Sequence, residues 1–158
     1  LVDVQYGKTE GNTQHPVFGI AASDEDLDTI RTTLKKKGIE FEDISEDDDV
    51  RFRMIHYQPE LCQHPLFVHI EFPERAGAFL DFMERIADLA SLCYFNYTYT
   101  GERVGRALVG MEFDTAEDRE TIRKRMGAFS KNIIRSIREI SPEAFQRIMG
   151  SRQLTGNH

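Results

Sequence analysis

Tryptophan is absent from this chain of 158 residues, which contains only two cysteines and five prolines. The cysteines, Cys62 and Cys93, lie far apart and form no CxxC motif. A small secreted domain held by disulfides normally has more cysteines, so we expect two reduced, mostly buried thiols in a cytoplasmic protein. The chain also lacks an apolar run of the about 20 residues that a membrane-spanning helix needs, and its first residues do not resemble a signal peptide.

Basic residues are in deficit: 20 lysines and arginines stand against 27 aspartates and glutamates, which gives a net charge of −7. Nucleic-acid-binding proteins usually have a basic surface, so this class is disfavoured. Hydrophobic residues make up 40% of the chain and charged residues 30%, as in a soluble globular protein. The composition therefore predicts a domain with a core that binds neither nucleic acid nor a membrane.

Motifs for enzymatic chemistry are also missing. There is no GxSxG nucleophile elbow, no phosphate-binding loop with its lysine and no GxGxxG motif. The histidines have no metal-ligand spacing, and the acidic segment 46–49 lacks the alternating ligands and turn glycine of a calcium site. Residues 101–105, GERVG, are expected to form a hairpin turn between two strands, because a phosphate loop needs a helix directly after it. We therefore predict no catalytic residues and no metal site.

An internal repeat organises the chain. Residues 17–20, 23–26 and 28–31 return in altered form as residues 108–111, 115–118 and 120–123. The preceding segments 4–6 (VQY) and 95–97 (FNY) also correspond, and each tyrosine is followed at the same distance by a glycine. Several matches in the same order indicate a duplication.

The second copy is complete. Residues 66–72 alternate between apolar and other side chains, as in a half-buried strand, and a bend at 73–77 leads into a helix with an apolar stripe from Phe79 to Leu89. There follow strands at 92–99 and 107–113, a helix capped by Thr115, a strand at 132–139 and a short closing helix after Ser141 and Pro142. The order β-α-β-β-α-β predicts an α+β fold of the ferredoxin-like type, an antiparallel sheet with its two helices on one face.

The first copy is incomplete, since its pattern predicts only strands at 1–7, 16–22 and 39–44 and a helix at 24–37. The predicted organisation is a partial subdomain (1–57), a linker (58–65), a complete subdomain (66–150) and a tail (151–158). An incomplete sheet leaves an apolar face and an unpaired edge. We therefore expect the missing strand and helix to lie upstream of Leu1 or to come from another chain, and we expect an oligomer or a larger parent polypeptide.

Residues 71–79, EFPERAGAF, have the parts of a small-ligand site. A strand ends, and a bend leads directly to a helix N-terminus, whose first amides lack intrahelical acceptors and attract a carboxylate. Gly77 would let a ligand approach the backbone, and the strand at 95–97 would add an apolar wall and a polar handle. The alternative is that the bend is only a turn and that Tyr97 is a core aromatic.

The phrase IEFPERAGAFL at 70–80 resembles the opening of an ACT-like domain, and in particular the regulatory region of biosynthetic threonine dehydratase (threonine ammonia-lyase). That family combines such a phrase with an F-[HN]-Y strand and a glycine-rich hairpin, here at 95–97 and 101–105. Its Asp-rich segment before V-R-[YF] and its His-Pro-Leu motif are matched at 47–52 and 64–66. The resemblance covers the latter half of one ACT-like subdomain and all of a second.

By this resemblance, the chain is the allosteric region of an enzyme that deaminates threonine to 2-oxobutanoate in isoleucine biosynthesis, using pyridoxal phosphate. Isoleucine would bind the tandem ACT-like subdomains as an inhibitor, and valine would oppose it. The family's cofactor lysine lies in a motif like S-F-K-x-R-G, and the lysines at 8, 35–37, 124 and 131 have no such surroundings. We therefore expect the cofactor and the catalytic residues in an upstream catalytic domain in cis, and neither in this chain.

Relatives commonly carry an arginine directly after the tyrosine of the F-[HN]-Y strand, whereas this chain has Thr98 there and Gly7 after the equivalent Tyr6. Losing a cation near the effector would weaken carboxylate binding by about 1.5–3 kcal/mol, unless Arg51, Arg53 or Arg75 compensates. The predicted effector-binding residues are Glu74, Arg75, Ala76, Gly77, Ala78, Phe79, Phe95, Asn96, Tyr97, Thr98, Tyr6 and Arg51.

The sequence leaves two other functions open. The incomplete first copy also suits a module that assembles subunits and binds no small molecule. A free-standing amino-acid sensor acting on another protein is the third possibility. Catalysis by this chain itself is least favoured, because no nucleophile–base pair or metal cluster can be read from the sequence.

Overall fold

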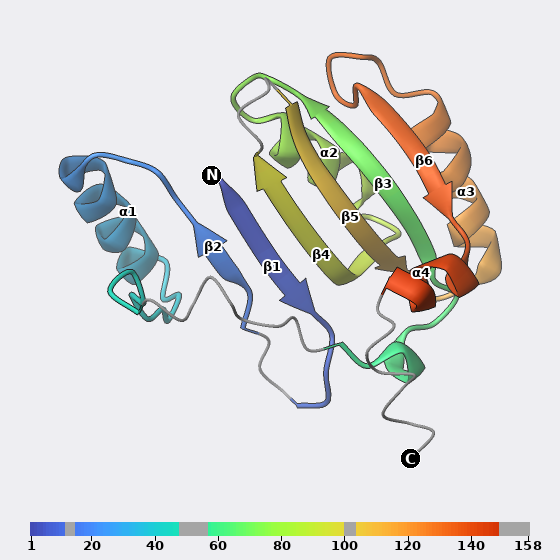
Figure 1. The fold of residues 1–158 in the computed structure, drawn as a ribbon, viewed down its shortest axis with the longest axis horizontal. Helices are drawn as coiled ribbons and strands as arrows, with labels where there is room; N and C mark the ends of the chain where they lie inside the picture. The colour runs from blue at the N-terminus through green and yellow to red at the C-terminus, as the bar shows by residue number, and fades with distance from the viewer. Residues whose placement is uncertain (12–14, 48–56, 100–103, 149–158) are drawn as a thin grey trace.

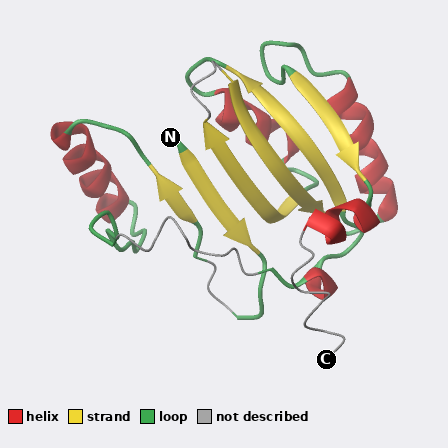
Figure 2. Ribbon diagram, in the orientation of Figure 1, coloured by secondary structure: helices red, strands yellow, loops and turns green. Residues whose placement is uncertain are grey.

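The computed structural model describes residues 1–11, 15–47, 57–99 and 104–148. Its strands form one antiparallel sheet in the order β2-β1-β4-β5-β3-β6 (Figure 2). The strands are β1 (Asp3–Gly7), β2 (Val17–Gly19), β3 (Leu66–Pro73), β4 (Ser91–Tyr99), β5 (Val104–Glu112) and β6 (Ser136–Ile140). The helices are α1 (Asp24–Lys36), α2 (Ala78–Ile86), α3 (Ala116–Gly127), α4 (Pro142–Ile148) and a short 3₁₀ helix at Pro59–Leu61.

The second copy has the predicted β-α-β-β-α-β order, so the ferredoxin-like α+β fold is confirmed. Its strands lie in the order β4-β5-β3-β6, and α2 and α3 both lie behind them in Figure 1. Alternate residues of β3 face these helices, as its period of two predicts. The core between the sheet and the helices includes Leu66, Val68, Ile70, Phe72, Phe82, Ile86, Val109, Met111, Ile122 and Met126, all buried.

A smaller core lies on the opposite face of the sheet, where α4 packs in front of the strands (Figure 1). Phe145 of α4 stacks on Phe67 of β3 with ring centroids 4.0 Å apart, and Tyr57 and Tyr94 meet it edge-on. Each such aromatic pair adds about 0.5–1.5 kcal/mol beyond the burial of its area. The closing helix predicted after Ser141 therefore covers part of the face that α2 and α3 leave open.

The first copy contains β1, β2 and α1 as predicted, with the strands shorter than expected. The predicted strand at 39–44 is wrong: this segment is irregular, and Ile39 and Phe41 remain 49% and 40% exposed. In the second copy the corresponding strand, β6, pairs with β3. The described residues contain no first-copy counterpart of β3, so the 39–44 segment has no strand to pair with and its alternating apolar residues stay in solvent.

The two copies share one sheet because β1 pairs directly with β4, its own counterpart in the repeat. Gln5 lies opposite Asn96, with Tyr6 opposite Phe95 and Val4 opposite Tyr97. Since Gln5 and Asn96 are also equivalent in the repeat, an approximate two-fold axis passes through this pair. The order β2-β1-β4-β5 is symmetric about that axis, an arrangement that the repeat pattern alone did not predict.

The duplication is also visible in the contacts of α1 and α3. Ser23 and Thr115 cap the two helices in the same way, each accepting the amide of the third residue that follows. In both helices an arginine forms ion pairs with an acidic residue three positions earlier and with a second acidic residue beyond the helix. In α1, Arg31 pairs with Asp28 and Asp43. In α3, Arg123 pairs with Glu120 and Glu139. The helices differ in packing, since α1 has no buried residue and α3 buries two.

We predict that the two caps differ in their effect on stability. Thr115→Ala should lower the free energy of unfolding by about 1 kcal/mol, because α3 is anchored in the core through Ile122 and Met126. Ser23→Ala removes the same bond from α1, which buries nothing, so it should loosen that helix with little effect on the cooperative transition. Urea unfolding followed by tyrosine fluorescence measures both; equal losses would contradict this difference in anchoring.

Candidate functional site

The bend between β3 and α2 has the backbone geometry that the sequence predicts. Gly77 is the residue before the first turn of α2, and its φ of 80° lies in the left-handed region that glycine adopts without strain. No side chain caps this helix end. A Cβ built on Gly77 would have no heavy atom within 4 Å, so the space in front of the glycine is open. A small ligand could therefore approach the first amides of α2 directly.

Arg75 fixes the bend to its surroundings. Its Nε donates to the carbonyl oxygen of Asn132 at 2.6 Å, and its Nη2 lies 2.5 Å from Oδ2 of Asp81. Its Nη1 donates to the carbonyl oxygen of Ala76 at 3.2 Å. The guanidinium thus joins the bend, the first turn of α2 and the segment after α3, and it presents a positive charge at the helix end that also carries the positive end of the helix dipole.

Aromatic side chains form one wall of the site. Phe79 lies in the first turn of α2, and its ring centroid is 5.0 Å from that of Phe95 and 6.5 Å from that of Tyr97. Phe95 is buried, whereas Phe79 and Tyr97 are partly exposed. Tyr6 lies opposite Phe95 across the β1–β4 pair and packs against the same core. The bend therefore lies at the margin of an apolar surface that continues from α2 across β4 to β1.

Tyr97 lies flat against the sheet because Gly105 of β5 has no side chain. A Cβ at Gly105 would come within 2.5 Å of the Tyr97 hydroxyl oxygen and within 2.6 Å of its ring. Burial raises the pKa of the Tyr97 phenol above its usual value, so this hydroxyl stays protonated and can donate or accept a hydrogen bond. Gly105 thus sets the position of the Tyr97 hydroxyl, the polar end of the aromatic wall.

Strand alternation divides the predicted site residues of β4 between two faces. Phe95 and Tyr97 belong to the core under α2. Asn96 and Thr98 point to the opposite face, where Thr98 is in register with Asp3 on one side and Arg106 on the other. The structure therefore brings Phe95 and Tyr97 to the bend and packs Tyr6 against the same core from β1, but it does not bring Asn96 or Thr98 to the bend.

The remaining predicted residues occupy three different settings. Glu74 and Ala76 are exposed at the bend, while Ala78, the first residue of α2, is buried. Arg51, predicted as an effector contact, lies outside the described residues, as does Arg53. The sequence reading missed Asp81, which pairs with Arg75, and the role of Gly105; the spacing of Arg75 and Asp81 across a helix start was the available signal for the first.

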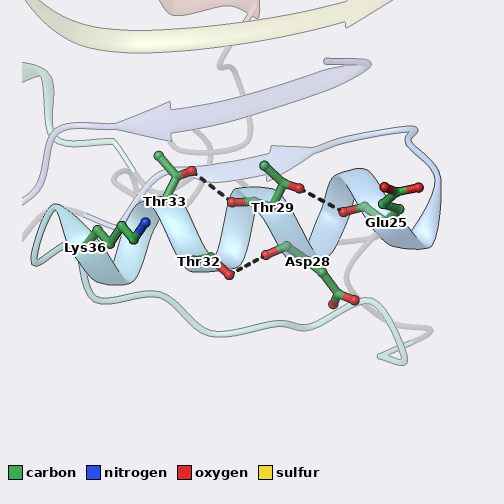
Figure 3. A pocket seen from close by; sticks show the side chains of 6 residues that line it. All are labelled: Glu25, Asp28, Thr29, Thr32, Thr33 and Lys36. Atoms are coloured by element: carbon green, nitrogen blue, oxygen red, sulfur yellow. Dashed lines mark hydrogen bonds between the residues drawn. The ribbon is translucent and has the colours of Figure 1, made fainter.

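Two surface hollows lie away from the bend. The first runs along α1 and is lined by Glu25, Asp28, Thr29, Thr32, Thr33 and Lys36 (Figure 3). Its three threonine hydroxyls donate to carbonyl oxygens one turn earlier, so these donors are already used within the helix. The second, about 270 Å³, lies between the end of α2 and the ends of β1 and β5, where Lys8 Nζ is 2.5 Å from Glu112 Oε1.

The lysines of this chain lie in hydrogen-bonded or exposed settings. The side-chain hydrogen bond to Glu112 raises the pKa of Lys8. Lys131 donates to the Arg135 carbonyl oxygen, and the others lie exposed on or beside α1 and α3. Within the described residues, no three His, Cys, Asp or Glu side chains are grouped as a metal ion would require.

None of the helices in the described part of the chain is long and apolar enough to cross a bilayer. Residues 62–136 match the family model of the C-terminal regulatory domain of threonine dehydratase. This match spans β3, α2, β4, β5 and α3, and so includes both the bend and the aromatic wall. A search of curated proteins found no match to the chain.

We predict that Gly105→Ala displaces the Tyr97 ring and destabilises the protein by about 1–3 kcal/mol through overpacking. Gly127→Ala is the matched control, because its Cβ would meet nothing within 4 Å and an alanine at the end of α3 should stabilise slightly. Thermal unfolding of both variants, and of Gly105→Ala combined with Tyr97→Ala, measures the coupling. If Gly105→Ala destabilises the Tyr97→Ala protein as much as it destabilises the wild type, the Tyr97 ring is not the cause of the loss.

Proposed function

We propose that this chain, whose residues 62–136 match the family model of the C-terminal regulatory domain of threonine dehydratase, binds a branched-chain amino acid and thereby controls a catalytic domain in cis. That catalytic domain would be a pyridoxal-phosphate-dependent threonine ammonia-lyase of isoleucine biosynthesis. The effector would be isoleucine as inhibitor, with valine as its antagonist. The observation that carries this proposal is the junction of an open helix N-terminus with a partly exposed aromatic wall, inside the segment that matches the family.

The chemistry of the junction suits a small apolar amino acid. The aliphatic side chain would lie against Phe79, Tyr97 and Tyr6, which are partly exposed and continuous with the buried core. Burying a side chain of the size of isoleucine contributes about 1.5–3 kcal/mol. The ligand would thereby cover apolar surface that the described part of the chain leaves in solvent.

The carboxylate of the effector would lie at the N-terminus of α2, beyond Gly77. Backbone amides at a helix start and the helix dipole both favour an anion there. Arg75 lies at the same end but is held by Asp81 at 2.5 Å. An effector carboxylate would therefore share or take over this guanidinium, and the loosened Asp81 would allow the first turn of α2 to move relative to the segment after α3.

The substitution of the family's arginine by Thr98 bears less on this site than the sequence suggested. Thr98 points to the sheet face opposite α2, where Arg106 of β5 is its neighbour in register. An arginine at position 98 would start from that face and point away from the bend. The proposed site therefore takes its positive charge from Arg75 and the helix end.

An effector in this position would touch both copies of the repeat. It would contact α2 and β4 of the second copy and Tyr6 of β1 in the first. An effector that makes better contacts with one packing of β1 against β4 and α2 increases the population of that packing. Such a difference in contacts between two states is what allosteric coupling requires.

We predict that L-isoleucine binds this protein with a sub-millimolar dissociation constant in calorimetric titration and that L-valine competes with it. Tyr97→Leu should weaken isoleucine binding about tenfold, or about 1.4 kcal/mol, because it removes the polar end of the aromatic wall. Asn96→Ala is the matched control, since it changes the neighbouring residue of the same strand on the opposite face. Its affinity should equal that of the wild type.

A second titration, with L-isoleucinol, tests the carboxylate contact without altering the protein. This analogue keeps the side chain and the ammonium group but carries a hydroxymethyl group in place of the carboxylate. It should not bind measurably if the helix end receives the anion. The proposal fails if isoleucine, valine, threonine and phenylalanine all show no binding below millimolar concentration, or if Asn96→Ala weakens binding as much as Tyr97→Leu.

The second candidate function, subunit assembly, is favoured by the exposed apolar residues of the first copy. Phe18 in β2 and Ile20 just after it are 53% and 40% exposed, and Ile39 and Phe41 of the irregular segment are 49% and 40% exposed. Within the described residues β2 pairs only with β1, so its other edge is open. By the two-fold symmetry of the sheet, a counterpart of β3 would lie along this edge, supplied by the same polypeptide or by another subunit.

We predict that the chain self-associates through this edge. In sedimentation velocity its mean mass should rise with concentration, and Phe18→Glu should abolish the rise by placing a charge in the contact. Leu80→Glu provides the control, because Leu80 is 58% exposed on α2, in the other copy. A monomer at every concentration would contradict assembly, as would an equal effect of the two substitutions.

A further inference from the structure

Two cysteines far apart in the sequence lie next to each other on the sheet face that α4 covers. Cys93 is the extra residue of a β-bulge in β4, since the register with β5 shifts between Leu92 and Tyr94. A bulge re-aims a side chain, and here Cys93 joins the core of Phe67, Tyr94 and Phe145, fully buried. Its backbone carbonyl accepts the amide of Lys8 at 2.7 Å, which fixes the bulge against the end of β1.

Cys62 reaches Cys93 from the segment before β3. It ends the short 3₁₀ helix, and its side chain is partly exposed. Its Sγ lies 3.4 Å from the Tyr57 hydroxyl, and its side chain packs against the small core that contains Cys93, within reach of a hydrogen bond from the Cys93 thiol. Backbone bonds from Gln58 to Lys8 and from Phe113 to Gln63 hold this segment to β1 and to the end of β5. The two thiols therefore lie on two segments, the one before β3 and the bulge of β4, that backbone hydrogen bonds hold in place.

The surroundings give the two thiols different reactivity. The hydrogen bond from Cys93, assisted by the one from Tyr57, lowers the pKa of Cys62 to about 7 from the ordinary thiol value. The same contact with Cys62, together with burial, raises the pKa of Cys93. The accessible thiol is thus a thiolate in a large fraction of molecules near neutral pH, whereas the buried thiol stays protonated beside it.

We propose that Cys62 and Cys93 form a peroxide-sensitive thiol pair, in which Cys62 is the reacting thiol and Cys93 the resolving one. The Cys62 thiolate attacks one oxygen of a hydroperoxide; an S–O bond forms, the O–O bond breaks, and the alkoxide or hydroxide leaves with a proton from solvent. Cys62 is then a sulfenic acid. The Cys93 sulfur attacks the Cys62 sulfur, the S–S bond forms, and the hydroxide of the sulfenic acid leaves with the Cys93 proton as water. Overall, two thiols are oxidised to a disulfide, and an organic hydroperoxide is reduced to an alcohol and water, or hydrogen peroxide to two waters.

The resolving step is helped by the first one. The pKa of Cys93 is raised chiefly by its hydrogen bond to Cys62. Ionisation of Cys93 would break this bond and place two thiolates side by side. A sulfenic acid at Cys62 carries no negative charge, so this penalty disappears when the resolving thiol is needed. Peroxide itself need not enter the buried core, since only Cys62 meets it.

The disulfide would tie the segment around Cys62 to β4, next to the aromatic core under α4. Tyr57 contacts both thiols and packs edge-on against Tyr94 and Phe145. Oxidation would therefore restrict the connection that joins the two copies of the repeat. This inference goes beyond effector binding and does not depend on it.

The test treats the reduced chain with hydrogen peroxide and maps its cysteines by mass spectrometry, with dimedone added to trap sulfenic acid. In the wild type we expect an intramolecular Cys62–Cys93 disulfide that dithiothreitol reverses. Cys93→Ala should lose the crosslink and accumulate the dimedone adduct at Cys62, and Cys62→Ser should lose both products. Alanine at 93 avoids burying a hydroxyl, and circular dichroism of each variant checks that it is folded.

Three results would overturn the proposal: no disulfide in the wild type, the same amount of Cys62 adduct with and without Cys93, or a dimedone adduct on Cys93 in the Cys62→Ser variant. The pH dependence of alkylation is an independent check. The rate for Cys62 with iodoacetamide should be half-maximal near pH 7, and it should follow the profile of an ordinary free thiol, at higher pH, in Cys93→Ala.

Discussion

The pairing of β1 with β4 is the constraint on which the rest of this structure depends. Five residues of β1 are in register with β4, and the two equivalent segments of the repeat meet at Gln5 and Asn96. This contact converts an incomplete copy and a complete one into a single sheet. It also places Tyr6 beside Phe95, brings the Lys8 amide to the bulge at Cys93 and lets the Lys8 ammonium reach Glu112. The aromatic wall contains residues from each side of this seam, and the thiol pair is held to it through the Lys8 amide.

The two faces of the shared sheet carry different chemistry, because side chains alternate along each strand. The face under α2 and α3 holds the main core, and where these helices end, over β4 and β1, its aromatic residues become partly exposed beside an open helix N-terminus. The other face holds Asn96, Thr98 and Arg106, together with the small core beneath α4. A regulatory ligand bound at the first face would touch both copies, whereas oxidation of Cys62 and Cys93 would act on the second. Ligand binding and thiol oxidation would then act independently, from opposite faces, on the sheet that the two copies share.

Much of the fold could be predicted from the sequence because its signals are local. The alternation of β3, the cap at Thr115 and the apolar stripe of α2 each depend on neighbouring residues, and all three elements formed as predicted. The strand at 39–44 failed because its alternation is real but its pairing partner is not among the described residues. Asn96 and Thr98 lie on the face opposite Tyr97, in keeping with the period of two that the sequence contains. The meeting of Cys62 and Cys93 could not have been predicted, since it depends on a bulge and on the pairing of distant segments.

Amide hydrogen exchange along β1 tests the central role of this seam most directly. β1 pairs on one side with β2 and on the other with β4, so its amides from Asp3 to Gly7 should be protected to a degree comparable with those of β5. The irregular segment 39–44 of the same copy provides an internal reference and should exchange rapidly. If the β1 amides exchange as rapidly as those of 39–44 while β3, β4 and β5 remain protected, the two copies do not share a sheet in solution. If β1 and β4 pair in solution as they do here, the β1 amides are protected to a degree comparable with those of the central strands.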